Sequence, residues 1–291
     1  MTRSKKRLST TLNAIYLFLI ALPVVDVIAA PAPLLWRVEG PHPSYLFGTI
    51  HSSDPRVKVI SPSVLNALTS CRSFHPEIEL SPETTGLMAS RLFNSAAPDL
   101  ETCLPPLLWE RVKTDGAKLG LPEPLLRQLS PGLAALLFTT PADETDISAT
   151  VDGQLYALSQ SHNLTIAALE TADEQLDLFD RLTPAQAQGL LAESLDDFDA
   201  GHVQFEKLVA AYAAGDERRI AAEVEDEFQQ PAAHDLADLL LYHRNEVMAA
   251  RSEAYLKRGG AFVAVGAAHL VGPRSMIARL RARGFKITRV P

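Results

Sequence analysis

The 291-residue chain is poor in the residues and motifs on which several common kinds of protein depend. Its two cysteines, which have no neighbouring Cys or His partners, are too few for a disulfide-rich scaffold or a zinc knuckle. It has no Gly-x-Ser-x-Gly elbow, no glycine-rich phosphate loop and no His-Glu-x-x-His helix. The sequence therefore argues against the serine hydrolases, nucleotide-binding proteins and zinc proteases that carry those motifs.

Positive charge is also scarce. The formal net charge is −8, whereas hydrophobic residues make up 47% and charged residues 21% of the chain, as in a globular protein. Nucleic acids and anionic lipids require a basic patch, which an acidic chain does not favour. We therefore expect no nucleic-acid partner.

The first thirty residues have the pattern of a secretory signal peptide. Basic residues precede the apolar run Ala14–Val25, and small residues up to Ala30 offer a cleavage site. The alternative is a retained N-terminal anchor, because Ala14–Ala30 approaches the length of a membrane span. We expect an exported protein, periplasmic or extracellular, that touches the membrane only through this segment if it stays uncleaved. Residues 31–291 would then form a single domain, with a net charge of −11 after loss of four positive charges and one negative charge.

The two cysteines, Cys71 and Cys103, admit two interpretations. Outside the cytoplasm such a pair can oxidise, so a disulfide is one hypothesis. Two buried free thiols are the other.

Short runs rich in Val, Ile, Leu and Phe predict strands, and Ser/Thr–Pro pairs predict helix starts. The predicted strands are Leu34–Val38, Ser44–Ile50, Ser73–Leu80, Leu164–Leu169, Ala261–Val265 and Lys286–Val290. The predicted helix starts are Ser61-Pro62, Ser81-Pro82, Ser130-Pro131, Thr183-Pro184 and a capping box from Thr171 to Glu174. Residues 82–160 and 171–258 are mostly helical in pattern. The pattern predicts an α/β fold: a central mixed sheet surrounded by helices, with a largely helical middle insertion.

Two segments at opposite ends of the mature chain have the same pattern, an apolar strand that runs into Gly-x-x-His and then a helix. Gly48 and Gly266 allow a sharp turn at each strand end. His51 and His269 then lie at the carboxyl ends of strands, where α/β sheets bind ligands. We predict two related half-units with adjacent strands, whose imidazoles bind a divalent metal or move protons. The alternative is a structural histidine on each turn. The other histidines are interpreted as ordinary: His42, His75, His162, His202, His234 and His243.

Two glutamates lie where a predicted strand passes into a helix, and so are candidates for the same site. Glu79 and Glu170 would complete a mixed nitrogen and oxygen metal shell, or act as base on a metal-bound water. The alternative is that each merely assists a helix N-terminus. Glu77 is assigned to the other face of its strand and is expected to be exposed.

Arg244 and Asn245 lie in the predicted helix Ala233–Leu256, beside its apolar stripe. A buried guanidinium needs a partner, which a carboxylate of the site or an anionic transition state would supply. The alternative is an arginine that extends to solvent at the edge of the stripe. Asp152, at the start of a predicted helix, is a weaker candidate.

Taken in order, these residues resemble the TraB/PrgY/GumN family over about residues 34–290. The matching segments are Tyr45–His51, Glu77–Leu80, Ala168–Gln175, Arg244-Asn245 and Val265–Leu270. The resemblance implies the fold shared with Tiki proteases and with the erythromycin esterase and ChaN groups. It also implies a site made of both Gly-x-x-His motifs, the strand-end glutamates and the Arg-Asn pair. In Tiki proteins that site belongs to a divalent-metal-dependent protease.

Three hypotheses for function are consistent with the sequence. The first is a divalent-metal-dependent hydrolase, a peptidase in preference to other types, that acts on a peptide or small-molecule substrate with manganese, cobalt or zinc. In it, Arg244 and Asn245 stabilise developing oxyanion charge. The second is a binding protein that captures haem or a peptide without turnover, since two histidines can ligate haem. The third is a helper protein in export or polysaccharide metabolism that acts through its surface.

Overall fold

The computed structural model describes residues 33–93, 98–139, 147–229 and 236–291. The predicted leader at residues 1–30 lies outside the described residues, as do His234 and the predicted helix start at Ala233. From residue 33 onward the described chain belongs to one compact unit. None of its helices has the length and apolar character needed to cross a membrane.

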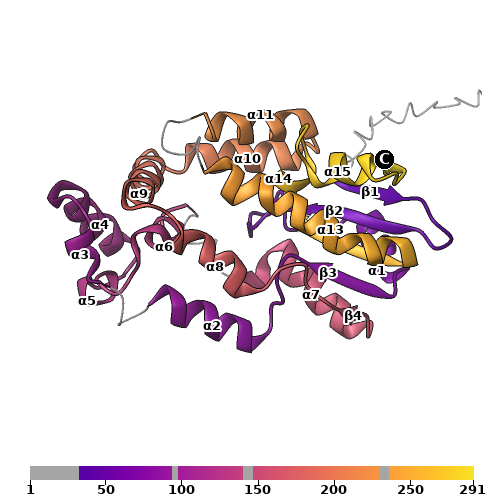
Figure 1. The fold of residues 1–291 in the computed structure, drawn as a ribbon, viewed down its shortest axis with the longest axis horizontal. Helices are drawn as coiled ribbons and strands as arrows, with labels where there is room; N and C mark the ends of the chain where they lie inside the picture. The colour runs from indigo at the N-terminus through magenta and orange to yellow at the C-terminus, as the bar shows by residue number, and fades with distance from the viewer. Residues whose placement is uncertain (1–32, 94–97, 140–146, 230–235) are drawn as a thin grey trace, which may run out of the picture. The chain divides into compact units, whose positions relative to one another are not determined.

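A six-stranded mixed sheet lies at the centre of the fold (Figure 1). Its strands are β1 (Leu35–Val38), β2 (Ser44–Thr49), β3 (Ser73–Pro76), β4 (Thr165–Ile166), β5 (Ala261–Gly266) and β6 (Ile287–Arg289). Their order is β4-β3-β5-β2-β1-β6. The first four in that order are parallel, whereas β1 pairs antiparallel with both β2 and β6. Every predicted strand is present, although the one predicted at Leu164–Leu169 is reduced to two residues.

The strands β2 and β5, which precede the two Gly-x-x-His turns, are neighbours in this sheet. They pair in parallel, with Gly48 opposite Val265 and Thr49 opposite Gly266. Both strands are buried along nearly their whole length, which explains the apolar sequence of β5 and the apolar Tyr45–Phe47 run of β2. The prediction that these two strands lie side by side is confirmed, so both turns start from the same edge of the sheet.

Helices surround the sheet, and their starts agree with the sequence signals. Ser61, Ser81, Ser130 and Thr183 each cap a helix that begins with proline, and Thr171 and Glu174 form both bonds of a capping box. The helices are α1 (Pro62–Thr69), α2 (Pro82–Leu92), α3 (Leu100–Cys103), α4 (Pro106–Lys118), α5 (Glu123–Leu126), α6 (Pro131–Leu136), α7 (Val151–Ser161), α8 (Ala172–Asp180), α9 (Pro184–Asp199), α10 (Val203–Ala213), α11 (Glu217–Glu227), α13 (His243–Arg258), α14 (Ala267–Leu270) and α15 (Met276–Ala282). A 3-10 turn (Ile147–Ala149) precedes α7, and a π-helical turn (Asp238–Tyr242) leads into α13.

The two faces of the sheet have separate hydrophobic cores. Met248 of α13 and Leu280 of α15 pack on one face, and Leu68 of α1 and Leu155 of α7 pack on the other. A third core, around Trp109, joins α4, α6 and α9. The helical middle of the chain therefore has a core of its own beside the sheet.

The hypothesis of a disulfide is wrong, because both cysteines are free. Cys71 is buried in the core beneath α1, whereas Cys103 ends α3 in the helical middle. Burial raises the pKa of the Cys71 thiol to about 12, so this thiol is protonated at neutral pH.

Candidate active site

His269 is the buried histidine of the site. The short helix α14 begins directly after β5, and the His269 side chain is only 7% exposed. Its Nδ1 lies 2.6 Å from Asn245 Oδ1, and Asn245 Nδ2 donates to the Arg274 carbonyl oxygen at 3.0 Å. Because Asn245 Oδ1 must accept, His269 Nδ1 carries the proton and Nε2 keeps its lone pair.

His51 is the exposed histidine of the site. It lies after β2 in an irregular turn, and 63% of its side chain is open to solvent. Its Nδ1 lies 3.0 Å from Asp152 Oδ2, in the first turn of α7. Tyr212 of α10 donates to the Gly48 carbonyl oxygen at 2.8 Å and so holds the turn from the other side. Asp152, which the sequence indicated only as a weaker candidate, therefore orients the His51 ring.

Glu77 joins the elements of the site, so its predicted exposure is wrong. Its side chain is 13% exposed, and Oε1 accepts from the Gly266 backbone N–H at 2.6 Å. Oε1 also lies 3.5 Å from His269 Nε2. Two causes explain the error: β3 ends at Pro76, and residues two apart point to the same side of a strand, so alternation does not separate Glu77 from Glu79.

Arg244 links Glu77 to Glu170. Its Nη2 donates to Glu77 Oε2 at 2.8 Å and to Glu170 Oε2 at 2.7 Å, and its Nε adds two bonds to Glu170. Gln175 Nε2 also donates to both carboxylates, at 3.3 and 3.0 Å. The partner that a buried Arg244 requires is thus a pair of carboxylates. Gln175 was missed, although it ends the run from Ala168 that carries the family resemblance.

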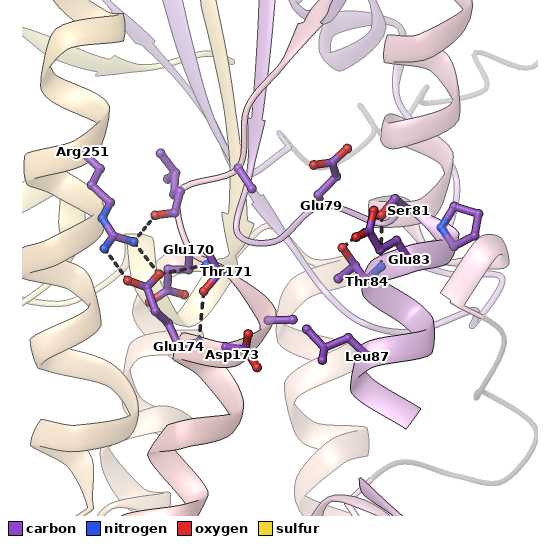
Figure 2. Close-up of a pocket in the computed structure, with 14 residues that line it drawn as sticks. Glu79, Ser81, Glu83, Thr84, Leu87, Glu170, Thr171, Asp173, Glu174 and Arg251 are labelled. Carbon is purple, nitrogen blue, oxygen red and sulfur yellow. Dashed lines mark hydrogen bonds and ion pairs between the residues drawn. The ribbon is translucent and has the colours of Figure 1, made fainter. Parts of the chain in front are cut away.

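Glu79 lies apart from this network. Its residue is exposed, and Tyr156 donates its hydroxyl to Glu79 Oε1 at 3.2 Å. Glu79 and Glu170 line a common cavity of about 910 Å³, whose lining includes neither histidine. Figure 2 shows Glu79 and Glu170 on opposite walls of this cavity, with Ser81 and Thr84 beside Glu79.

Neither Gly48 nor Gly266 adopts a left-handed backbone, so the conformational freedom of glycine does not explain these two positions. Space is tight at both positions, against backbone at Gly48 and against a side chain at Gly266. A Cβ on Gly48 would lie 3.1 Å from Ala267 Cα, and a Cβ on Gly266 would lie 3.3 Å from Glu77 Oε1.

Glu77, His269 and His51 differ in their protonation at neutral pH. Burial alone would raise the pKa of Glu77, but His269, Arg244 and His51 hold it at about 2, so Glu77 is ionised at neutral pH. Burial lowers the pKa of His269 to about 4, against the opposing effect of Glu77, so its ring is neutral. Asp152 raises the pKa of His51 to about 9, although water screens part of this attraction at an exposed ring.

The side chains near Glu77 carry the kinds of atoms that bind a divalent metal. Imidazole nitrogen and carboxylate oxygen bind zinc, manganese or cobalt, and histidine ligands usually have the other ring nitrogen hydrogen-bonded. Both histidines meet that condition, and His269 Nε2 already lies close to Glu77. Within the described ranges, however, no three or more His, Cys, Asp or Glu side chains converge closely enough to hold a metal ion. The donor types therefore suit a divalent cation, whereas the described side chains do not converge into a ligand set.

Several known proteins are similar to this chain. A model of the TraB/PrgY/gumN family matches residues 34–289. The chain is 26% identical over 312 residues to Metalloprotease TIKI1 of Danio rerio, and 27% identical over 322 residues to Metalloprotease TIKI2 of the same species. Metalloprotease TIKI2 of Xenopus tropicalis is 26% identical over 319 residues. Each match covers 88% of this chain but only 63%, 61% and 60% of the relative. No solved structure is significantly similar to the chain.

Proposed function

The chain belongs to the TraB/PrgY/gumN family, and from that premise we propose that it is a divalent-metal-dependent hydrolase that cleaves peptide bonds. Relatives at about 26% identity are named metalloproteases, which supports hydrolysis of peptides. The observation that carries the proposal is the similar position and Nδ1 hydrogen bonding of the two imidazoles. Each comes after one of two adjacent parallel strands, and each has Nδ1 bound by a side-chain oxygen. Nε2 of His269 is then available to a ligand, whereas Nε2 of His51, which is protonated at neutral pH, would bind a metal with release of its proton.

His51 Nε2, His269 Nε2 and Glu77 would hold the metal. When bound, a divalent cation polarises the scissile carbonyl and lowers the pKa of water. Glu77 suits this role because it is ionised at neutral pH and is anchored by the Gly266 N–H. Asp152 and Asn245 orient the two rings, so Asn245 acts through His269 and does not contact the substrate.

Glu170 and Arg244 supply the remaining chemistry. Glu170 borders the cavity, and its Oε1 would accept the proton of the attacking water. Arg244 is positively charged at all relevant pH values, because Glu77 and Glu170 raise its pKa against the effect of burial. Its charge stabilises the developing oxyanion, a role worth about 2.7–4 kcal/mol per donor in other enzymes.

The test is cleavage of a quenched fluorescent peptide library by the purified protein, with manganese, cobalt or zinc added. We expect metal-stimulated cleavage that falls at least about 100-fold in His51→Ala and His269→Ala. His162→Ala, an exposed histidine at the end of α7, is the matched control and keeps full activity. Unchanged cleavage in both site variants would refute the assignment. A haem-binding absorbance change without turnover would favour the binding protein instead.

We also propose that the protein acts outside the cytoplasm, on the basis of the signal-peptide pattern in residues 1–30. Fractionation of cells that express the full chain tests this, with the N-terminus of the exported product sequenced. A product that starts near Pro31 supports a cleaved leader, and a membrane-bound product that still starts at Met1 supports the anchor.

A further inference from the structure

The helix α13 carries a second arginine, Arg251, about two turns after Arg244 and therefore on nearly the same side of the helix. Its Nη1 donates to the Leu169 carbonyl oxygen at 2.6 Å. Nη1 and Nη2 also bind the two carboxylate oxygens of Glu174, at 2.8 and 2.6 Å. Figure 2 shows Arg251 reaching Glu174 and the backbone just before Glu170.

Arg251 and Glu174 thereby hold the turn that carries Glu170. Glu174 Oε2 also accepts from the Thr171 N–H at 2.9 Å, within the capping box of α8. On its other side the turn is tied to the end of β3, where the Glu170 N–H donates to the Glu77 carbonyl oxygen at 2.7 Å. The backbone of this turn is therefore held by the strand end and by Arg251, whereas Arg244 and Gln175 bind the Glu170 carboxylate.

We propose that Arg251 is a positioning residue, which fixes the Leu169–Glu174 turn so that the Glu170 carboxylate stays aligned with Glu77 and Arg244. This inference rests on the proposed function, because it assigns Arg251 to the reaction through Glu170. Arg251 lines the cavity near Glu170, but its hydrogen bonds go to Leu169 and Glu174, so the proposed effect on the reaction passes through Glu170.

Two other cations of this region distinguish positioning from ordinary surface pairing. Lys257, also on α13, pairs with Glu253 four residues earlier, an exposed contact of the kind that contributes little. Arg91 of α2 binds α8 itself, through Asp173, Asp177 and Asp180. Arg91 thus contacts the turn itself at Asp173, whereas the bond of Lys257 reaches neither Leu169 nor Glu174, so Lys257→Gln is the matched control.

The first experiment does not require activity. Hydrogen exchange is measured at the Glu170 amide, whose bond to the Glu77 carbonyl reports the position of the turn. We expect exchange about tenfold faster in Arg251→Gln and Glu174→Gln, because a lost charge-assisted bond loosens the turn. Lys257→Gln leaves it unchanged. Equal exchange in the wild type and Arg251→Gln overturns the proposal, whether or not the protein proves to be a peptidase.

The second experiment uses peptide cleavage. We expect Arg251→Gln to lower kcat about tenfold with little change in KM. Arg251→Lys keeps the positive charge but cannot make the two parallel hydrogen bonds of a guanidinium, so it should retain part of the rate. In a Glu170→Asp background, where the carboxylate is already displaced, Arg251→Gln costs less. An undiminished effect there, or an effect on KM alone, means that Arg251 contacts the substrate and overturns the positioning role. Absence of cleavage by the wild type refutes the proposed function, and the exchange experiment then decides this inference.

Discussion

The Gly48–His51 turn leaves its imidazole 63% exposed, whereas the Gly266–His269 turn buries its imidazole to 7% exposure. The two share a motif and leave neighbouring strands, so the difference arises from the segment after each glycine. After Gly266 the chain enters α14 at once, which places His269 against Asn245 of α13. After Gly48 the strand β2 ends at Thr49, the chain continues as an irregular segment, and His51 meets Asp152 of α7. The Gly-x-x-His motif thus places each histidine at the carboxyl end of its strand. The residue packed against the ring, Asn245 or Asp152, and the burial of the ring then determine whether the ring is charged.

The largest expected difference between the turns is in stability. His269→Ala removes a buried ring and leaves Asn245 Oδ1 without its donor, so we expect the free energy of unfolding to fall by about 3 kcal/mol. His51→Ala removes an exposed ring and changes this free energy by less than about 0.5 kcal/mol. Urea unfolding of both variants at pH 7 measures the difference. Equal losses would show that the two rings have similar environments.

Acid should destabilise the protein through His269. Its folded-state pKa of about 4 is below the ordinary value of 6.5, so the unfolded chain binds the proton first as the pH falls. Stability is then lost between about pH 6.5 and pH 4, by up to about 3 kcal/mol. Urea unfolding across this range in the wild type and in His269→Gln checks the prediction, because the variant lacks this loss. An identical acid profile in the variant would mean that His269 titrates normally.

Substitution by alanine should destabilise the protein more at Gly48 than at Gly266. In Gly48→Ala the new Cβ meets the Ala267 backbone at 3.1 Å and Leu34 Cβ at 3.2 Å, and we expect a loss of about 1–3 kcal/mol. In Gly266→Ala it meets the Glu77 carboxylate, which can shift, so stability falls by less than about 1 kcal/mol while cleavage is impaired. Thermal unfolding and the peptide assay separate the two. Greater destabilisation by Gly266→Ala would contradict the packing account.

The smallest effect should be on the alkaline side. Asp152 raises the pKa of His51 to about 9, above its unfolded value, so this pair stabilises the protein below about pH 6.5 and the contribution is lost as the pH rises to 9. Because the ring is exposed, the effect is small. NMR titration of the His51 ring in Asp152→Asn should give a pKa near the ordinary value. A pKa that stays high in Asp152→Asn would exclude Asp152 as the cause.

Local signals in the sequence were sufficient for much of the fold. The caps at Ser61, Ser81 and Thr183 depend on neighbouring residues, and β2 and β5 are buried strands with apolar centres. Contacts between segments that are distant in the sequence could not be predicted from such local signals. The Asp152–His51 pair and the place of Gln175 between two carboxylates arise only when separate helices meet the sheet edge.

Glu77 shows the limit most clearly. Its exposure was inferred from a strand that continued to Leu80, but β3 stops at Pro76 and Glu77 turns toward Arg244 and Gly266. The end of a short strand is set by its sheet partners, here β4 and β5, which lie far away in the sequence.

The most direct test of the central claim is calorimetric titration of the purified protein with Zn²⁺ or Mn²⁺ in four forms: wild type, His51→Ala, His269→Ala and the control His162→Ala. If both turns serve one ligand, the wild type and the control bind a single ion, and each site variant loses at least about tenfold in affinity. Unchanged affinity in either site variant, or no binding by the wild type, would contradict the account.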